Sequence, residues 1–95
     1  MAAYVIADVN VTDTNLYEEY KKRVLATVEK YGGRFAVRGG TVESKEGDWA
    51  PVRLIMLEFP TMGQARMWYH SPEYKPLLEM RLKAASAKLI LVEGV

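Results

Sequence analysis

The sequence predicts an α+β fold in which strands and helices follow the order βαββαβ. Three observations carry this prediction: strand-like patterns occur in four segments, apolar residues recur at helical spacing in two others, and glycine or proline lies at several of the boundaries between segments. The 95 residues, 49% of them hydrophobic and 26% charged, have the composition of one ordinary globular domain. We therefore expect a single domain over residues 1–95.

The first third of the chain predicts a strand and then a helix. Residues 3–11 alternate with a period of two and contain several β-branched side chains. Residues 12–14 offer a helix N-cap, and Gly32 and Gly33 end the helix because glycine adopts the left-handed C-terminal conformation at little cost. The helix itself is predicted from apolar residues at three- and four-residue spacing: Tyr17, Tyr20, Val24, Val28 and Tyr31.

The middle of the chain predicts a β-hairpin. A long strand is expected over residues 34–45, with a bulge or bend at the glycine pair 39–40. Turn-forming residues at 46–51 then lead into a β-rich run at 52–59, which Pro60 closes.

The last third predicts a helix that is broken in the middle, followed by a final strand. Residues 61–70 have a helical pattern, and Ser71-Pro72 restarts a second helical piece that continues to Ala85. The final strand, 87–93, is apolar on both faces, which predicts burial on both sides.

This order, with right-handed crossovers, predicts a ferredoxin-like sandwich: a four-stranded antiparallel sheet in spatial order 4-1-3-2 with both helices on one face. The strand period predicts that the helix-facing residues are Val5, Ala7, Val9, Phe35, Val37, Ile55, Leu57 and Phe59. The opposite, open face is predicted to consist of Tyr4, Ile6, Asp8, Arg34, Ala36, Arg38, Leu54, Met56 and Glu58.

The open face is too apolar to lie in water, so we expect a second copy of the chain to cover it. The sequence thus predicts a homodimer in which Asp8, Arg38 and Glu58 pair with one another. Trp49, in the hairpin loop, is expected either to close a pocket or to fill this interface.

Composition excludes several classes of partner and cofactor. The net charge of +1, from 13 basic and 12 acidic residues, argues against a nucleic-acid partner. No apolar run approaches the roughly 20 residues of a membrane helix and no leader is apparent, so no membrane partner and a cytoplasmic location are expected. One histidine, no cysteine and no phosphate-cradling glycine motif predict no metal and no cofactor.

Across its whole length the sequence resembles a bacterial family of the dimeric α/β-barrel superfamily, known only as a domain of unknown function. The resemblance rests on Tyr17-x-x-Tyr20, Gly32-Gly33-Arg34-Phe35, Val37-Arg38-Gly39-Gly40, Glu46-Gly47-Asp48-Trp49, Phe59-Pro60, and Trp68-Tyr69-His70-Ser71-Pro72-Glu73-Tyr74 followed by Arg81. It implies a dimeric barrel in a cytoplasmic bacterial setting but no particular reaction. The wider superfamily includes cofactor-free oxygenases, lactone isomerases, and dehalogenating and haem-degrading enzymes.

Two residues are candidates for proton transfer. His70, the only histidine, lies at the break in the second helix and is suited to general acid or base work, although a histidine exposed at a helix end is the alternative. Asp8 is the second candidate, and it is also a partner on offer to Arg38.

The candidate substrate-binding residues are Arg38, Tyr74, Arg81, Trp68 and Ser71. Arg38 either binds a carboxylate or joins a structural ion-pair cluster at the dimer core. Tyr74 and Arg81 lie about two helical turns apart on one side of the second helical piece, where they either bind an anionic or phenolic ligand or simply pack. Ser71 is expected to act as an N-cap rather than as a nucleophile.

Three functions follow from these residues. The first is a cofactor-independent enzyme that acts on a small acidic or aromatic metabolite, and the second is a non-catalytic small-molecule-binding or homodimeric assembly module. The third is haem handling, because Asn10 and Trp68 lie on the elements that haem-degrading relatives use, although His70 follows Trp68 too closely to match their histidine.

Overall fold

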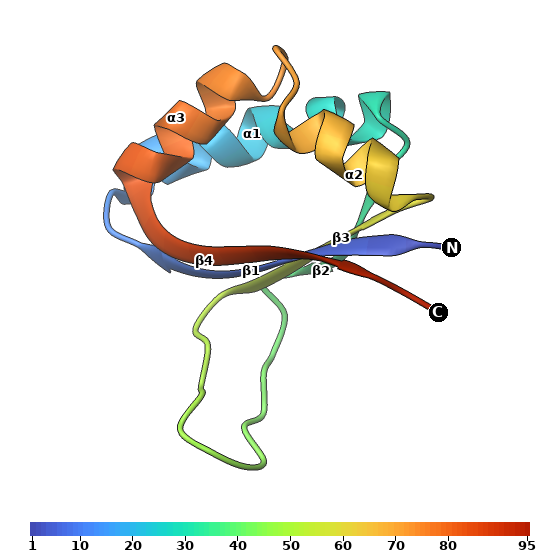
Figure 1. The fold of residues 1–95 in the computed structure, drawn as a ribbon. Coiled ribbons are helices and arrows are strands. Elements are labelled where there is room, and N and C mark those ends of the chain that lie inside the picture. The colour runs from blue at the N-terminus through green and yellow to red at the C-terminus, as the bar shows by residue number, and fades with distance from the viewer.

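A computed structural model describes all residues of the chain, Met1–Val95, as one sheet covered by helices on one face (Figure 1). The elements are β1 (Ala3–Val11), α1 (Thr14–Lys30), β2 (Arg34–Arg38), β3 (Leu54–Phe59), α2 (Met62–Tyr69), α3 (Lys75–Ala84) and β4 (Ala85–Glu93). The sheet has the order β2-β3-β1-β4 and all its pairs are antiparallel, which confirms the predicted topology and the break in the second helix. No helix is long and apolar enough to cross a membrane.

Helix α1 begins and ends as its sequence predicts. The Asp13 side chain accepts a hydrogen bond from the backbone N–H of Leu16 (3.1 Å) and so caps the first turn. At the other end Gly32 has a φ of 83°, and its N–H and that of Gly33 donate to the carbonyls of Glu29 and Val28. This Schellman arrangement turns the chain directly into β2.

The core lies between the helices and the inner face of the sheet. Its large, fully buried side chains are Val5, Val28, Phe59, Trp68 and Tyr74. Trp68 and Tyr74 stack with ring centroids 4.1 Å apart, and Phe59 lies 5.7 Å from Trp68 on the sheet side. Two of the aromatic groups on which the core depends therefore lie on either side of the break between α2 and α3, Trp68 near the end of α2 and Tyr74 at the N-cap of α3.

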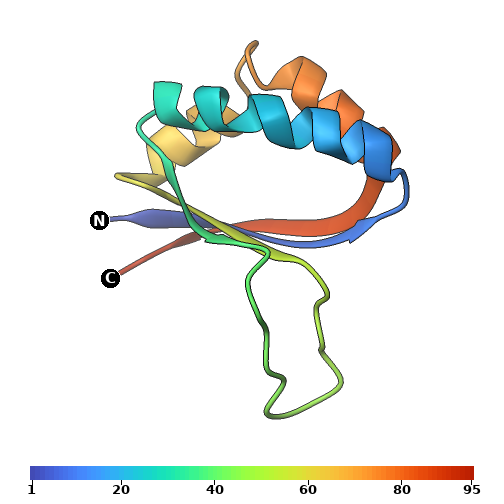
Figure 2. The ribbon, with the colours of Figure 1, turned by 180° about the vertical axis from the view of Figure 1, so that it is seen from behind.

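The predicted long strand at 34–45 is wrong beyond Arg38. Gly39 adopts a φ of 70°, and after its N–H donates to the Leu54 carbonyl (3.0 Å) the chain leaves the sheet. Residues 40–53 form a loop that projects from the open face, away from the helices (Figures 1 and 2). Trp49 holds this loop to the sheet, since its Nε1–H donates to Asp8 Oδ2 (2.8 Å).

A β-bulge in β2 corrects the predicted faces of the sheet. Phe35 pairs with Leu57, but the register then shifts so that Val37 pairs with Met56 and Arg38 pairs with Ile55. Because directly paired residues share a face, Val37 joins the open face and Arg38 joins the helix side. The sequence period assigned both residues to the opposite faces.

Strand β4 was predicted to be buried on both sides, and within the chain it is not. Leu89 and Leu91 pack against the core on the helix side. Ile90 and Val92, which point the other way, are 57% and 41% exposed. The strand lies at the edge of the sheet and has no cover on its open face in the single chain.

Candidate functional site

A narrow cavity opens between the helices and the inner face of the sheet. Its interior offers about 40 Å³ to water-sized occupants. The residues that line it are Val5, Ala7, Val9, Tyr17, Tyr20, Lys21, Val24, Phe35, Arg38, Arg53, Ile55, Leu57, Trp68, Tyr74, Arg81 and Leu89. Every strand and every helix of the fold contributes at least one of them.

The charges around this cavity all have the same sign. Of its 16 lining residues 12 are hydrophobic, and the other four are Lys21, Arg38, Arg53 and Arg81. No carboxylate lines the cavity. Like charges above low-dielectric walls focus a positive potential into such a hollow, which favours an anionic occupant.

Arg81 is the buried member of this group. It is 5% exposed, and its one side-chain hydrogen bond runs from Nε to the hydroxyl of Tyr74 (3.4 Å). None of the ion pairs in the chain involves Arg81. A buried guanidinium without a carboxylate is costly, so the fold retains here a charge that lacks a counterion.

Two tyrosine hydroxyls form a hydrogen-bonded chain with Arg81 in the wall of the cavity. The hydroxyls of Tyr74 and Tyr20 lie 2.8 Å apart and share a hydrogen bond. Burial, with the neighbouring Tyr74 second, raises the pKa of Tyr20 far above its ordinary value. Trp68 packs against Tyr74 and is fixed by its own Nε1–H, which donates to Thr27 Oγ1 (3.0 Å).

The mouth of the cavity is framed by two further arginines. The Arg38 guanidinium lies 4.2 Å from the centroid of the Phe35 ring and donates from Nη2 to the Lys21 carbonyl (2.9 Å). The Arg53 guanidinium lies 5.1 Å from the centroid of the Tyr17 ring. Both contacts are cation–π interactions with rings that themselves line the cavity.

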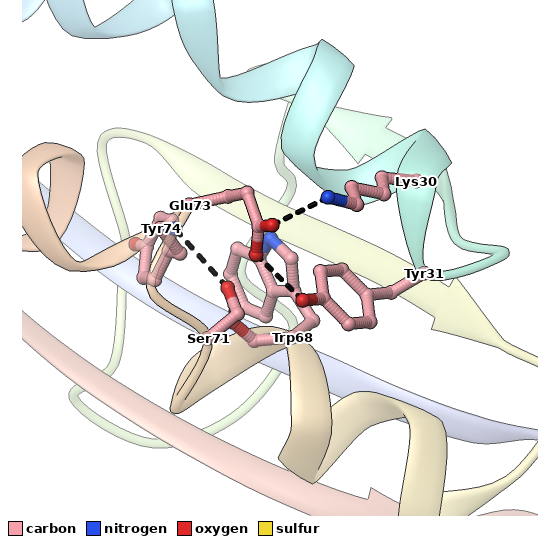
Figure 3. A network of polar contacts seen from close by, with 6 residues as sticks. All are labelled: Lys30, Tyr31, Trp68, Ser71, Glu73 and Tyr74. Atoms are coloured by element: carbon pink, nitrogen blue, oxygen red, sulfur yellow. Dashed lines mark hydrogen bonds and ion pairs between the residues drawn. The ribbon is translucent and has the colours of Figure 1, made fainter.

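Ser71 does not line the cavity, but it stabilises the turn between α2 and α3 that leads to Tyr74 (Figure 3). Its hydroxyl donates to the Trp68 carbonyl (2.7 Å) and accepts from the Tyr74 N–H (3.1 Å). The serine thus caps the turn at residues 72–74. Helix α3 itself begins at Lys75 with Tyr74 at its N-cap, so the predicted helix start at Pro72 is three residues too early.

Glu73 fastens the same turn to the end of α1 (Figure 3). The Tyr31 hydroxyl donates to Glu73 Oε1 (2.6 Å), and the Lys30 ammonium donates to Oε2. These two bonds, that of Lys30 first, lower the pKa of Glu73 to about 2. Sequence reasoning did not single out Glu73.

The two residues predicted to transfer protons do not reach the cavity. His70 is exposed at the C-terminal cap of α2, where its ring contacts Tyr69. Asp8 lies on the open face, bound to Trp49. The predicted cluster of Asp8, Arg38 and Glu58 is also not formed within the chain, because Arg38 is on the helix side and Glu58 pairs with Arg34 (3.0 Å).

The residues considered for haem handling do not meet either. Asn10 lines a shallow hollow beside Ser86 and Lys88, whereas Trp68 is buried in the helix-side cavity. A second hollow on the open face, lined by Ile6, Asp8, Asp48, Trp49, Lys88 and Ile90, lies between the loop and the sheet. It contains charges of both signs, whereas the charged residues of the helix-side cavity are all cationic.

Comparison with protein families places residues 2–95 in a single model, described as domain of unknown function DUF1330. The chain belongs to this family. Comparison with curated protein sequences gives no match. Family membership confirms the resemblance found in the sequence and assigns no reaction.

Solved structures share the fold of this DUF1330 chain at low sequence identity. A protein of unknown function from Rhodopseudomonas palustris is 17% identical with a TM-score of 0.74, and the match covers 99% of this chain and 82% of that one. SnoaB, a cofactor-independent oxygenase from Streptomyces nogalater, is 14% identical with a TM-score of 0.67, over 99% and 92% of the chains. A putative antibiotic biosynthesis monooxygenase from Nitrosomonas europaea is 15% identical with a TM-score of 0.63, over 99% and 90%.

The DUF1330 cavity thus contains four of the five residues predicted to bind substrate: Arg38, Tyr74, Arg81 and Trp68. Sequence reasoning missed Arg53, although a signal was present. Arg53 has the same strand parity as the helix-facing Ile55 and Leu57, and a cation in that series marks a break in the apolar pattern. Tyr17 and Tyr20 were predicted only as core residues of the helix.

Proposed function

We propose that the cavity binds a small carboxylic acid with an aromatic or apolar body, and that Arg81 and Tyr74 hold its carboxylate. The observation that carries this proposal is the 5% exposed Arg81 guanidinium, which has no carboxylate partner in the chain. A bound carboxylate supplies the missing counterion and accepts charge-assisted hydrogen bonds from the guanidinium.

The apolar walls of the cavity are suited to the aromatic or apolar body of the ligand. Twelve hydrophobic residues line the cavity, and Trp68 and Tyr74 offer aromatic surfaces for stacking. The interior of about 40 Å³ holds a few water molecules only, so the ligand enters by displacing side chains at the mouth.

We further propose that any reaction here is a cofactor-independent proton transfer through Tyr74 and Tyr20 rather than through His70 or Asp8. Their hydroxyls are 2.8 Å apart beside Arg81, so Tyr74 can donate a proton to a ligand oxygen while Tyr20 hydrogen-bonds to it. The fold of SnoaB, described as a cofactor-independent oxygenase, supports such chemistry by analogy alone.

Isothermal titration calorimetry with phenylacetate tests the binding proposal. The wild-type chain is expected to bind it, and Arg81→Gln is expected to weaken binding at least about tenfold through loss of a charge-assisted contact. Arg23→Gln, which removes an exposed arginine from α1, is the matched control. Equal binding by wild type and Arg81→Gln contradicts the proposal.

Catalysis is tested separately with phenylpyruvate, an aromatic carboxylate whose enol–keto interconversion needs proton transfer only. Ultraviolet absorbance of the enol gives the rate, and Tyr74→Phe is expected to lower a wild-type acceleration by about 10²-fold or more. Binding without acceleration favours the alternative function, a non-catalytic small-molecule-binding module.

The open face supports a second proposal, a homodimer. Ile90, Val92 and Trp49 are 57%, 41% and 61% exposed, and Ile6 and Met56 lie half-buried among them. A second copy would remove this apolar surface from water. Sedimentation velocity is expected to give a dimer that Ile90→Asp converts to monomer. Leu82→Asp, at a 64% exposed site on α3, is expected to leave it dimeric.

A further inference from the structure

The mouth of the cavity contains more positive charge than one carboxylate needs. Lys21 is partly neutralised by Glu18, 3.4 Å away. Arg38 and Arg53 have no carboxylate partner, and both lie apart from the buried Arg81 in the fold: they come from β2 and the segment before β3, whereas Arg81 comes from α3.

Each of these two arginines is held by contacts with residues that line the cavity. Arg38 is held by its hydrogen bond to the Lys21 carbonyl and by the Phe35 ring, while Arg53 rests on Tyr17. The Arg53 side chain also runs beside Gly39, the neighbour of Arg38, since a Cβ at Gly39 would lie 3.8 Å from Arg53 Cγ. Both arginines therefore contact rings that line one cavity.

Tyr17 lines the cavity together with the buried Arg81 and with Arg38 and Arg53. Burial raises the pKa of its hydroxyl, and the positive charges of Arg53, Arg81 and Arg38, in that order, act against this rise. Tyr17 lines the same cavity as all three arginines, and its ring lies 5.1 Å from the Arg53 guanidinium. A ligand beside Tyr17 would therefore meet positive charge from more than one arginine.

We infer that the cavity selects a dianionic ligand, an aromatic or apolar acid whose second anionic group meets Arg38 and Arg53 at the rim while its first meets Arg81. This inference rests on the proposed function, because it names the substrate class of the same site. A ligand with a negative charge at each end would also explain why four cations surround a cavity without a carboxylate.

Matched acids test the inference by calorimetry at low ionic strength. Phenylacetate is the monoanion, 4-carboxyphenylacetate and 1,4-phenylenediacetate are dianions of two lengths, and the 4-methyl ester of 4-carboxyphenylacetate is the isostere with a neutral end. We expect at least one dianion to bind the wild-type chain about tenfold more tightly than phenylacetate or the ester.

Variants separate this inference from the proposed function. The double variant Arg38→Gln/Arg53→Gln is expected to bring the dianion-to-monoanion ratio to about one. Phenylacetate, held by Arg81, is expected still to bind, but more weakly because two of the four cations that line the cavity are gone. Arg81→Gln is expected to weaken all four acids, and Arg23→Gln is expected to change none. Thermal melts confirm that each variant is folded.

A wild-type ratio near one for both dianions, with phenylacetate still bound, overturns the inference and leaves the proposed function standing. A tenfold ratio that persists in the double variant also overturns it, because the second anionic group then lies elsewhere. Failure of all four acids to bind overturns the inference and the proposed function together.

Discussion

The two faces of the sheet treat their charged groups in opposite ways. On the open face the two carboxylates of the strands have partners within the chain: Asp8 accepts from Trp49 and Glu58 pairs with Arg34. On the helix side, Arg38, Arg53 and Arg81 face a common cavity in which no carboxylate is present. The difference teaches that apolar burial alone does not identify the site. The open face has apolar side chains that nothing in the chain covers, and the helix side has arginines without carboxylate partners.

The largest expected effect concerns the packing that holds the helix side together. Trp68→Ala removes a buried indole between Phe59 and Tyr74, and it is expected to lower the free energy of unfolding by about 3–5 kcal/mol. Urea denaturation followed by circular dichroism measures the change. Trp49→Ala, at the exposed tryptophan, is the comparison, and a loss of similar size there would contradict this contrast between the faces.

The next effect has the opposite sign. Arg81→Met replaces a buried, unpaired guanidinium with an apolar side chain, so the free energy of unfolding is expected to rise by about 1–4 kcal/mol while phenylacetate binding is lost. Denaturation and calorimetry on the same variant check both parts. Arg23→Met, on the exposed side of α1, is expected to change stability by no more than about 0.5 kcal/mol. A destabilised Arg81→Met would show that Arg81 serves the fold.

A pair of single-group deletions compares the polar groups of the two faces. Tyr74→Phe removes a buried hydroxyl that serves both Tyr20 and Arg81, and it is expected to cost about 1–3 kcal/mol of stability. Trp49→Phe removes an exposed hydrogen bond to Asp8 and is expected to cost less than about 1 kcal/mol. Chemical denaturation measures both losses of stability, and equal losses would contradict the distinction between buried polar groups on the helix side and exposed ones on the open face.

The smallest effect appears only as a dependence on pH. The pKa of Glu73 is lowered from 4.5 to about 2, so its contribution to stability is full above about pH 4.5 and is lost as the pH falls toward 2. Glu73→Gln is therefore expected to melt below wild type at neutral pH and to approach it in acid. Glu79→Gln, on the exposed side of α3, is the control. A melting-point difference that stays constant from about pH 6 to about pH 2 would contradict the assignment.

Most of the fold followed from local patterns. The bounds of β1 and the buried stripe of α1 were read from periodicity, because both elements bury one regular face. The end of β2 was not predictable in this way. Residues 41–45 have strand-like residue types, yet strand formation also needs a partner, and the chain leaves the sheet at Gly39.

The candidate site was predicted in part. Arg81 and Tyr74 were placed together because a helix has a fixed repeat, and both line the cavity. For His70 the sequence left two interpretations open, and the structure places it as the alternative described, an exposed histidine at a helix end, since being the only histidine says nothing about which way its side chain points. Arg38 was placed on the wrong face because a bulge adds one unpaired residue, and a period-two count cannot register such an addition.

That single extra residue in β2 also decides which environment Arg38 meets. Ala36 has no partner between Phe35 and Val37, so its deletion would remove the bulge and leave Val37 opposite Met56 and Arg38 opposite Ile55, still on the helix side. A regular pairing that included Ala36 would instead carry Arg38 to the open face, toward the region of Asp8. The position of this arginine is therefore set by the register of the strand as much as by the identity of its residues.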